Sequence, residues 1–207
     1  DTKMHAQLTR FLLVPSLIYL ATSGLAAKRN VADFADFDRQ AHAGGRLSVV
    51  FFGASLTWGA NASDPMKTSY RALIAKRLEA KYPKAHFKFH DAAIGGTGSQ
   101  LGIFRLELDV LRHNPDLVFL DFSANDGIGT ADKETLSSYE AIVRKLVAEA
   151  RVPVVQVAFP FSWDVQWGRF ETMHRLLAHE KIAKAYGTAF GDAIGLCKER
   201  IKSKETT

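Results

Sequence analysis

Cysteine is almost absent from this sequence: Cys197 is the only one among 207 residues, which also include only 6 prolines. A single cysteine cannot form an internal disulfide, and it excludes a structural zinc site built from cysteines. Because 47% of the residues are hydrophobic, the chain is long and apolar enough to bury one sizeable core. We therefore expect one globular domain that depends on its core for stability.

A strong excess of either charge is also absent, since the formal net charge is only +5. Basic residues are most concentrated near the C-terminus, where acidic residues interrupt them: Lys198, Glu199, Arg200, Lys202, Lys204 and Glu205. Nucleic-acid surfaces usually show an uninterrupted basic block or interleaved aromatic side chains, and this segment has neither. We interpret it as a solvated helix end or tail, and we expect no nucleic-acid partner.

The N-terminal apolar run, Phe11 to Leu20, is shorter than the roughly 18 residues that a membrane-spanning helix requires. It follows Met4 and the basic Arg10, and small residues lead from it to Ala27. This order is typical of a secretory signal peptide, with a membrane anchor or an ordinary buried helix as the alternatives. We predict that residues 1–27 are a signal peptide with upstream residues, and that the mature protein is secreted or periplasmic without stable membrane insertion.

The histidines lack the spacing of metal ligands. His174 and His179 are five residues apart, whereas two ligands on one helical face lie four apart. The other histidines also lack this spacing: His42, His86, His90 and His113. We expect surface or core-edge positions for these four and for His179. We therefore predict no metal and no organic cofactor.

From residue 46 onward, two kinds of apolar segment alternate. Predicted strands cover residues 46–52, 86–94, 115–123 and 152–160. Helical periodicity marks residues 69–82, 138–150 and 171–187. It also marks a further helix, one side of which carries Leu101, Phe104, Leu108 and Leu111. This alternation predicts an α/β fold, a doubly wound, flavodoxin-like parallel sheet with helices on both faces. Residues 28–45 form an N-terminal segment, either a short helix or an extended cap.

Three polar loops follow the first three predicted strands: "GASLTWG" (53–59), "GGTGS" (95–99) and "SANDG" (123–127). Ligands of parallel sheets bind outside the carboxyl ends of the strands, so these loops are expected on one rim. There Ser55 would be the nucleophile of an acyl transfer. Its own backbone N–H, a backbone N–H of the glycine-rich loop and the side-chain amide of Asn125 would hold the oxyanion. Glycine permits close backbone approach, and asparagine donates hydrogen bonds without charge.

These blocks resemble those of the SGNH, or GDSL-type, hydrolase family, in the same order and each at the end of a predicted strand. The resemblance covers roughly residues 46 to 190 and implies ester hydrolysis through an acyl-serine intermediate. It maps the nucleophile to Ser55, the oxyanion glycine to Gly96, with Gly95 as the alternative, and the oxyanion asparagine to Asn125.

The chain departs from the family pattern in three places. The usual Gly-Asp-Ser is Gly53-Ala54-Ser55, and the usual glycine of the third block is Ser123. The late Asp-x-x-His block, which carries the catalytic acid and base, occurs nowhere, and the nearest pattern, Glu171 to His174, lies inside a predicted helix. We therefore expect residues 46–207 to form a hydrolase domain without its final unit, with the missing pair just beyond Thr207 and little activity in this chain alone.

Other interpretations of the same residues remain open. Ser55 and Asn125 could merely cap turns, and we interpret Asp126 mainly as a structural residue of its loop. The spacing Gly96-x-Gly98-x-x-x-Gly102 between a strand and a helix also suggests a dinucleotide or phosphate cradle, although it misses Gly-x-Gly-x-x-Gly by one residue.

The substrate is suggested by what surrounds these blocks. No long apolar lid segment is present to hold a lipid, so we expect a small-molecule or carbohydrate ester with a short acyl group such as acetyl. Trp163 and Trp167, just after the fourth predicted strand, are either packing residues or a wall on which a sugar could stack. The alternative function is a carbohydrate-binding module that keeps this fold without catalysis.

Overall fold

The computed structural model describes residues 34–126, 133–161 and 174–203. Within these ranges five parallel strands form one sheet in the order β2-β1-β3-β4-β5. The strands are β1 (Arg46–Gly53), β2 (His86–Ala93), β3 (Leu117–Asp121), β4 (Val154–Ala158) and β5 (Ala189–Asp192). This strand order and the parallel pairing confirm the predicted doubly wound α/β fold.

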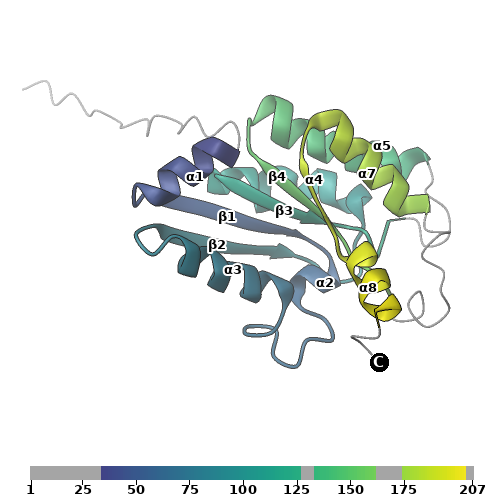
Figure 1. Cartoon of the computed structure of the whole chain (residues 1–207). Coiled ribbons are helices and arrows are strands. Elements are labelled where there is room, and N and C mark those ends of the chain that lie inside the picture. The colour runs from purple at the N-terminus through teal and green to yellow at the C-terminus, as the bar shows by residue number, and fades with distance from the viewer. Residues whose placement is uncertain (1–33, 127–132, 162–173, 204–207) are drawn as a thin grey trace, which may run out of the picture.

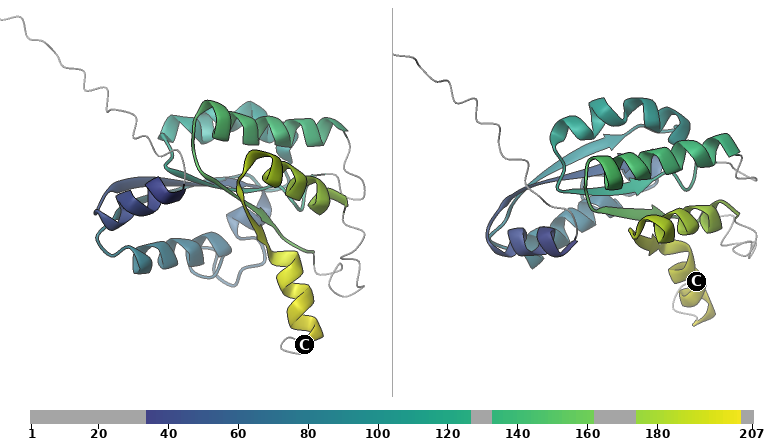
Figure 2. Two further views of the ribbon diagram at one scale, coloured as in Figure 1. Left: turned by 45° about the horizontal axis from the view of Figure 1, so that its top comes forward. Right: turned by 90° about the horizontal axis from the view of Figure 1, so that it is seen from above.

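Helices cover both faces of the sheet, as Figure 1 and the turned views of Figure 2 show. Those of the described ranges are α1 (Phe34–His42), α2 (Ser55–Trp58), α3 (Tyr70–Lys81), α4 (Ser99–Asp109), α5 (Lys133–Arg144), α7 (His174–Tyr186) and α8 (Ala193–Lys202). A 3₁₀ turn, η1 (Leu111–His113), follows α4, and a π-helical turn, η2 (Lys145–Glu149), extends α5. The helices α4, α5 and α7 lie on one face, and α1 and α3 lie on the other.

The alternation of side chains along β1 divides the core into two clusters. Val50 and Phe52 belong to the cluster under α4 and α5, whereas Val49 and Phe51 belong to the cluster under α1 and α3. All five residues of the central strand β3 are buried, which is why its sequence is apolar almost throughout. The sheet is therefore a fixed platform, and its carboxyl edge positions the loops that follow it.

The apolar side of α4 does not face the sheet. Leu101, Phe104 and Leu108 are 49%, 84% and 64% exposed, and the residues that face the sheet include Gly102 and Arg105. A Cβ at Gly102 would lie 2.8 Å from the Phe122 ring, so the helix packs too closely to the sheet for large side chains there. Hydrophobic periodicity alone does not detect an inward glycine and arginine.

The second half of the N-terminal segment 28–45 forms α1, whose Phe37 and Ala41 are buried. The helix α7 ends at Tyr186, before Gly187 in the left-handed conformation, as its sequence indicated. In the basic segment, Glu199, Arg200 and Lys202 are exposed in the last turn of α8, in agreement with a solvated helix end, and Lys204 and Glu205 lie outside the described residues.

The proposed signal peptide lies outside the described residues. In the part of the chain that is described, no helix has the length and apolar character needed to cross a bilayer.

Candidate active site

The three predicted loops meet at the carboxyl edge of the sheet, because the strands that precede them are neighbours. Gly53 at the end of β1 is in register with Ala93 of β2 and with Asp121 of β3. Ser55 begins the short helix α2 directly after β1 (Figure 1). A Cβ built at Gly95, after β2, would lie 3.8 Å from the Ser55 Cβ. The nucleophile predicted from the sequence therefore lies against the glycine loop, which we define as residues 94–98.

The turn that presents Ser55 requires glycine at its start. A Cβ at Gly53 would lie 2.2 Å from the Thr57 Oγ1 and 2.3 Å from the carbonyl oxygen of Asp121. The next N–H, that of Ala54, donates to the same carbonyl at 3.2 Å. We call residues 53–59 the nucleophile turn; its entry is fixed by backbone contact with β3.

Thr57 holds this turn through buried side-chain hydrogen bonds. Its side chain is fully buried, and its Oγ1 donates to the Asp121 Oδ2 at 3.2 Å. Because the Thr57 proton is used in this bond, the Tyr70 hydroxyl donates to the Thr57 Oγ1 at 3.0 Å. Ala54, at the position of the family's aspartate, is buried and apolar. The support for the turn therefore comes from β3 and α3.

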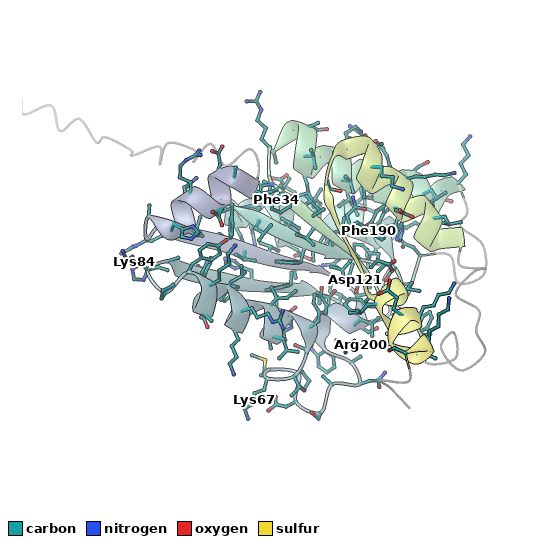
Figure 3. The ribbon with its side chains drawn as sticks, in the orientation of Figure 1. Phe34, Lys67, Lys84, Asp121, Phe190 and Arg200 are labelled. Atoms are coloured by element: carbon teal, nitrogen blue, oxygen red, sulfur yellow. The ribbon has the colours of Figure 1, made fainter. Side chains whose placement is uncertain are left out.

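Asp121 also holds the third loop, residues 122–126. Its Oδ1 accepts hydrogen bonds from the Ser123 N–H at 3.1 Å and the Ser123 hydroxyl at 2.8 Å. The Ser123 hydroxyl oxygen in turn accepts the Phe159 N–H at 2.9 Å, which links this loop to the end of β4. Figure 3 labels Asp121 at the carboxyl end of β3. The serine that replaces the family's glycine thus adds two hydrogen bonds that glycine cannot make.

Burial is the dominant influence on two ionisable groups in this network. It raises the pKa of the Asp121 carboxyl, while the hydrogen bonds from Ser123 and Thr57 act in the opposite direction. Burial, together with the nearby Asp121 carboxylate, raises the pKa of the Tyr70 phenol well above its usual value. The network therefore disfavours charge, and Tyr70 remains a neutral donor.

Arg105 supports the edge of the sheet from beneath, and the sequence analysis did not single it out. It is buried, and it donates to the carbonyl oxygen of Ala92 at 2.7 Å and to that of Gly53 at 2.8 Å. Its guanidinium lies 4.5 Å from the centre of the Phe52 ring. The arginine thereby links the ends of β1 and β2 just before Ser55 and Gly95. The signal for it was a single arginine in the middle of an apolar helical stretch.

The predicted oxyanion residues lie in the two loops beside Ser55. Gly96 has φ +74°, a conformation that favours glycine, and a Cβ there would meet nothing within 4 Å. Asn125 is half-buried, and its Oδ1 has no hydrogen-bond partner among the residues that the structure describes. Gly95 is the nearer of the two glycines to Ser55, so the assignment of the donor to Gly96 rests on the sequence pattern.

The rival interpretation as a phosphate cradle meets a physical obstacle. The Asp126 Oδ1 accepts the Ser99 N–H at 2.7 Å, at the first residue of α4. A Cβ at Gly98 would lie 2.9 Å from the same oxygen. A carboxylate therefore occupies the helix N-terminus at which a phosphate would bind, and it would repel one.

The tryptophans and histidines that the sequence analysis named occupy different parts of the chain. Trp163 and Trp167 lie outside the described residues, as does Glu171, whereas His174 is the first residue of α7. His179, expected at the surface or core edge, is buried. No group of three or more potential metal ligands occurs in the described ranges.

Comparison with known proteins relates this chain to a family and to solved structures. Residues 51–205 match the model of the GDSL-like lipase/acylhydrolase family. Among curated proteins, none matches the chain. A two-domain esterase active on acetylated mannans is similar in structure, with 28% identity over 82% of this chain and a TM-score of 0.71. This chain spans 43% of that esterase, less than half of its length.

Two acetyl xylan esterases share the fold at lower identity. One, named AlAXEase, has 22% identity over 77% of this chain and 84% of its own, with a TM-score of 0.57. The other, a catalytic mutant from Geobacillus stearothermophilus, has 20% identity over 75% of this chain and 80% of its own, with a TM-score of 0.61. Because the family model covers residues 51–205, most of the sequence, the chain belongs to the GDSL-like lipase/acylhydrolase family.

Proposed function

We propose that this protein is a serine ester hydrolase that acts through an acyl-serine intermediate on Ser55. Family members and the similar solved structures are ester hydrolases. The observation that carries the proposal is the position of Ser55, at the start of α2 and beside Gly95 on the carboxyl edge of the sheet. A serine in a tight turn after a buried strand can reach an ester carbonyl from a fixed backbone position.

In the proposed reaction the Ser55 hydroxyl oxygen attacks the carbonyl carbon of the ester while a general base takes its proton. The N–H groups of Ser55 and Gly96 and the amide of Asn125 would stabilise the oxyanion that forms. The C–O bond to the alcohol then breaks, and the alcohol leaves with the proton. Water hydrolyses the acyl-serine by the same route and releases the carboxylic acid.

The general base is proposed to come from outside the described residues. In those residues no histidine or carboxylate forms a hydrogen bond with the Ser55 hydroxyl. His179 does not fit the role, because it is buried and its Nε2 faces Asp126 at 3.4 Å. We propose that the full-length protein supplies an Asp-x-x-His pair, a pattern that these 207 residues lack.

A short acyl group on a saccharide is the proposed substrate. Trp58 lies three residues after Ser55 on α2, and it is 51% exposed. An exposed indole so near the nucleophile offers an apolar face on which a sugar ring can stack. The similar two-domain esterase is active on acetylated mannans.

The nucleophile can be tested by substitution in the full-length protein. Ser55→Ala should lower the turnover of p-nitrophenyl acetate by a factor on the order of a thousand or more, because nucleophile and base act as a unit. Ser137→Ala is the control, since Ser137 is exposed on α5 and bonds only within its helix. Unchanged turnover in Ser55→Ala would remove Ser55 from the mechanism. Binding of oligosaccharides without any ester hydrolysis would favour the alternative, a carbohydrate-binding module.

The substrate class can be tested through Trp58. Trp58→Ala should raise KM for acetylated mannooligosaccharides roughly fivefold, equivalent to about 1 kcal/mol of lost stacking, and leave p-nitrophenyl acetate turnover unchanged. Phe104→Ala is a matched control, because this aromatic lies on α4 and is 84% exposed. Equal effects on both esters would argue that Trp58 holds the turn and does not recognise a sugar.

A further inference from the structure

Asp126 and His179 form a buried pair that the proposed reaction does not use. Asp126 directly follows Asn125 in the third loop, and it is 2% exposed. His179 comes from α7, about fifty residues further along the chain, and it is 1% exposed. The Asp126 Oδ2 and the His179 Nε2 lie 3.4 Å apart. Two polar groups buried to this degree are rarely retained without a role.

The other oxygen of Asp126 connects two loops. The Oδ1 accepts the Ser99 N–H at 2.7 Å, just after the glycine loop ends, and Asp126 itself belongs to the third loop. The Asp126 backbone N–H donates to the Phe122 carbonyl at 2.9 Å, so the carboxylate rests on a closed turn. One carboxylate therefore fixes the loop of Asn125 relative to the loop of Gly96.

His179 holds the free side of that carboxylate. The Nε2 is the polar partner that faces the Asp126 Oδ2, by electrostatic contact alone, since this oxygen and both His179 nitrogen atoms form no hydrogen bond among the described residues. An unpartnered buried carboxylate oxygen is costly, and the carboxylate would rotate or admit water to relieve that cost. His179 is thus positioned to keep Asp126 in the orientation that bonds Ser99.

The imidazole is itself held in place by packing. Its ring stacks on Tyr139 with the ring centres 3.9 Å apart and an interplanar angle of 18°. The Tyr139 hydroxyl donates to the Gln156 Oε1 at 2.9 Å, and the Gln156 amide donates to the Thr188 hydroxyl at 2.7 Å. The pair is therefore anchored through α5 and β4.

We propose that Asp126 and His179 are positioning residues that set the distance between the two oxyanion donors, the N–H of Gly96 and the amide of Asn125. The inference depends on the proposed function of the site. Neither residue needs to contact the substrate, since both act through Asn125 and the glycine loop. The pair makes the geometry of the oxyanion hole depend on α7, a helix that contributes no residue to it.

His179→Phe in the full-length protein tests this role, because phenylalanine keeps the stack on Tyr139 and removes both nitrogen atoms. We expect kcat for p-nitrophenyl acetate to fall by roughly ten- to a hundredfold with KM nearly unchanged, as for a small misplacement of catalytic donors. Asp126→Asn keeps an acceptor for the Ser99 N–H, so we expect its kcat to fall less than that of His179→Phe. If His179→Phe does not fold, His179→Gln serves in its place.

A double-mutant cycle with Asn125→Ala separates positioning from general structural damage. Once the Asn125 amide is absent, His179→Phe should lower kcat by less than about threefold, because a donor that it positions has been removed. A full multiplicative loss in that background would overturn the proposal, as would an unchanged kcat in the wild-type background.

Asp116→Asn is the matched control. Asp116 is a buried carboxylate that accepts the Ser48 N–H at 2.7 Å, and it precedes β3 at the opposite end of the sheet from the candidate site. The Asp116→Asn substitution should reduce thermal stability without a change in kcat per folded molecule. The outcome for Ser55→Ala distinguishes two failures: if that variant is inactive and His179→Phe is fully active, only the positioning pair is wrong.

Discussion

The nucleophile turn and the glycine loop lie against each other but are stabilised in different ways. The nucleophile turn is fixed by buried side chains, since Thr57 and Ser123 share the Asp121 carboxylate. The glycine loop has exposed residues at Gly95 and Gly96. At its start the Ile94 N–H donates to the Gly53 carbonyl at 3.1 Å, and within it the Thr97 hydroxyl donates to the Ile94 carbonyl at 2.7 Å. The nucleophile is therefore held from within the core, whereas the neighbouring donor is held only at the two ends of its loop.

The largest expected effect is on the nucleophile turn. Gly53→Ala places a methyl group 2.2 Å from the Thr57 Oγ1, so β1 or the turn must move. We expect a loss of about 3 kcal/mol in the free energy of unfolding, at the upper end for overpacking, measured by urea denaturation. Gly191→Ala in β5 is the matched control, since its Cβ would have the Gln156 carbonyl oxygen as its nearest neighbour, at 3.7 Å. Equal stability of the two variants would show that the turn is not rigid.

A second expected effect is on the pH dependence of stability. Burial raises the pKa of Asp121 above its ordinary value of 3.8, so folding favours the protonated carboxyl. Its contribution to stability is present below pH 3.8 and is lost as the pH rises through the raised value. Asp121→Asn keeps an acceptor oxygen for Ser123, reverses the Thr57 bond so that the amide N–H donates to the Thr57 Oγ1, and removes this loss. Unfolding curves from pH 3 upward should therefore be flatter in the variant, and parallel curves would contradict the account.

The smallest expected effect is on the glycine loop. Gly96→Ala must adopt φ +74° but meets no atom within 4 Å, so we expect a loss of only about 1 kcal/mol in stability. Gly187→Ala, at φ +64° after α7, has the same conformational cost and equally open surroundings. Both should lower the melting temperature alike, but only Gly96→Ala should lower kcat. Equal kcat values would favour Gly95 over Gly96 as the donor.

Local sequence patterns predicted the strands and loops well, because their signals are local. The apolar β-branched run before Gly53 and the loop after β3 are where the sequence indicated. The hydrogen bond between Thr57 and Asp121 joins residues 64 positions apart, and no local pattern reports it.

The errors also have physical causes. Arg105 faces inward because the ends of β1 and β2 offer carbonyl oxygens to its guanidinium, which reverses the polarity expected for α4. His179 is buried because Asp126 and Tyr139 surround it, and these partners come from distant segments. The strand β5 was not predicted, since Ala189–Asp192 is short and carries one large apolar residue, Phe190.

The central claim, that Ser55 is the nucleophile, is tested most directly by covalent trapping. The full-length protein would be treated with diethyl p-nitrophenyl phosphate, digested and analysed by mass spectrometry. We predict one diethylphosphoryl group, on the peptide that contains Ser55, and loss of esterase activity in proportion to labelling. Labelling of a different residue, or full inactivation with Ser55 unmodified, would contradict the account.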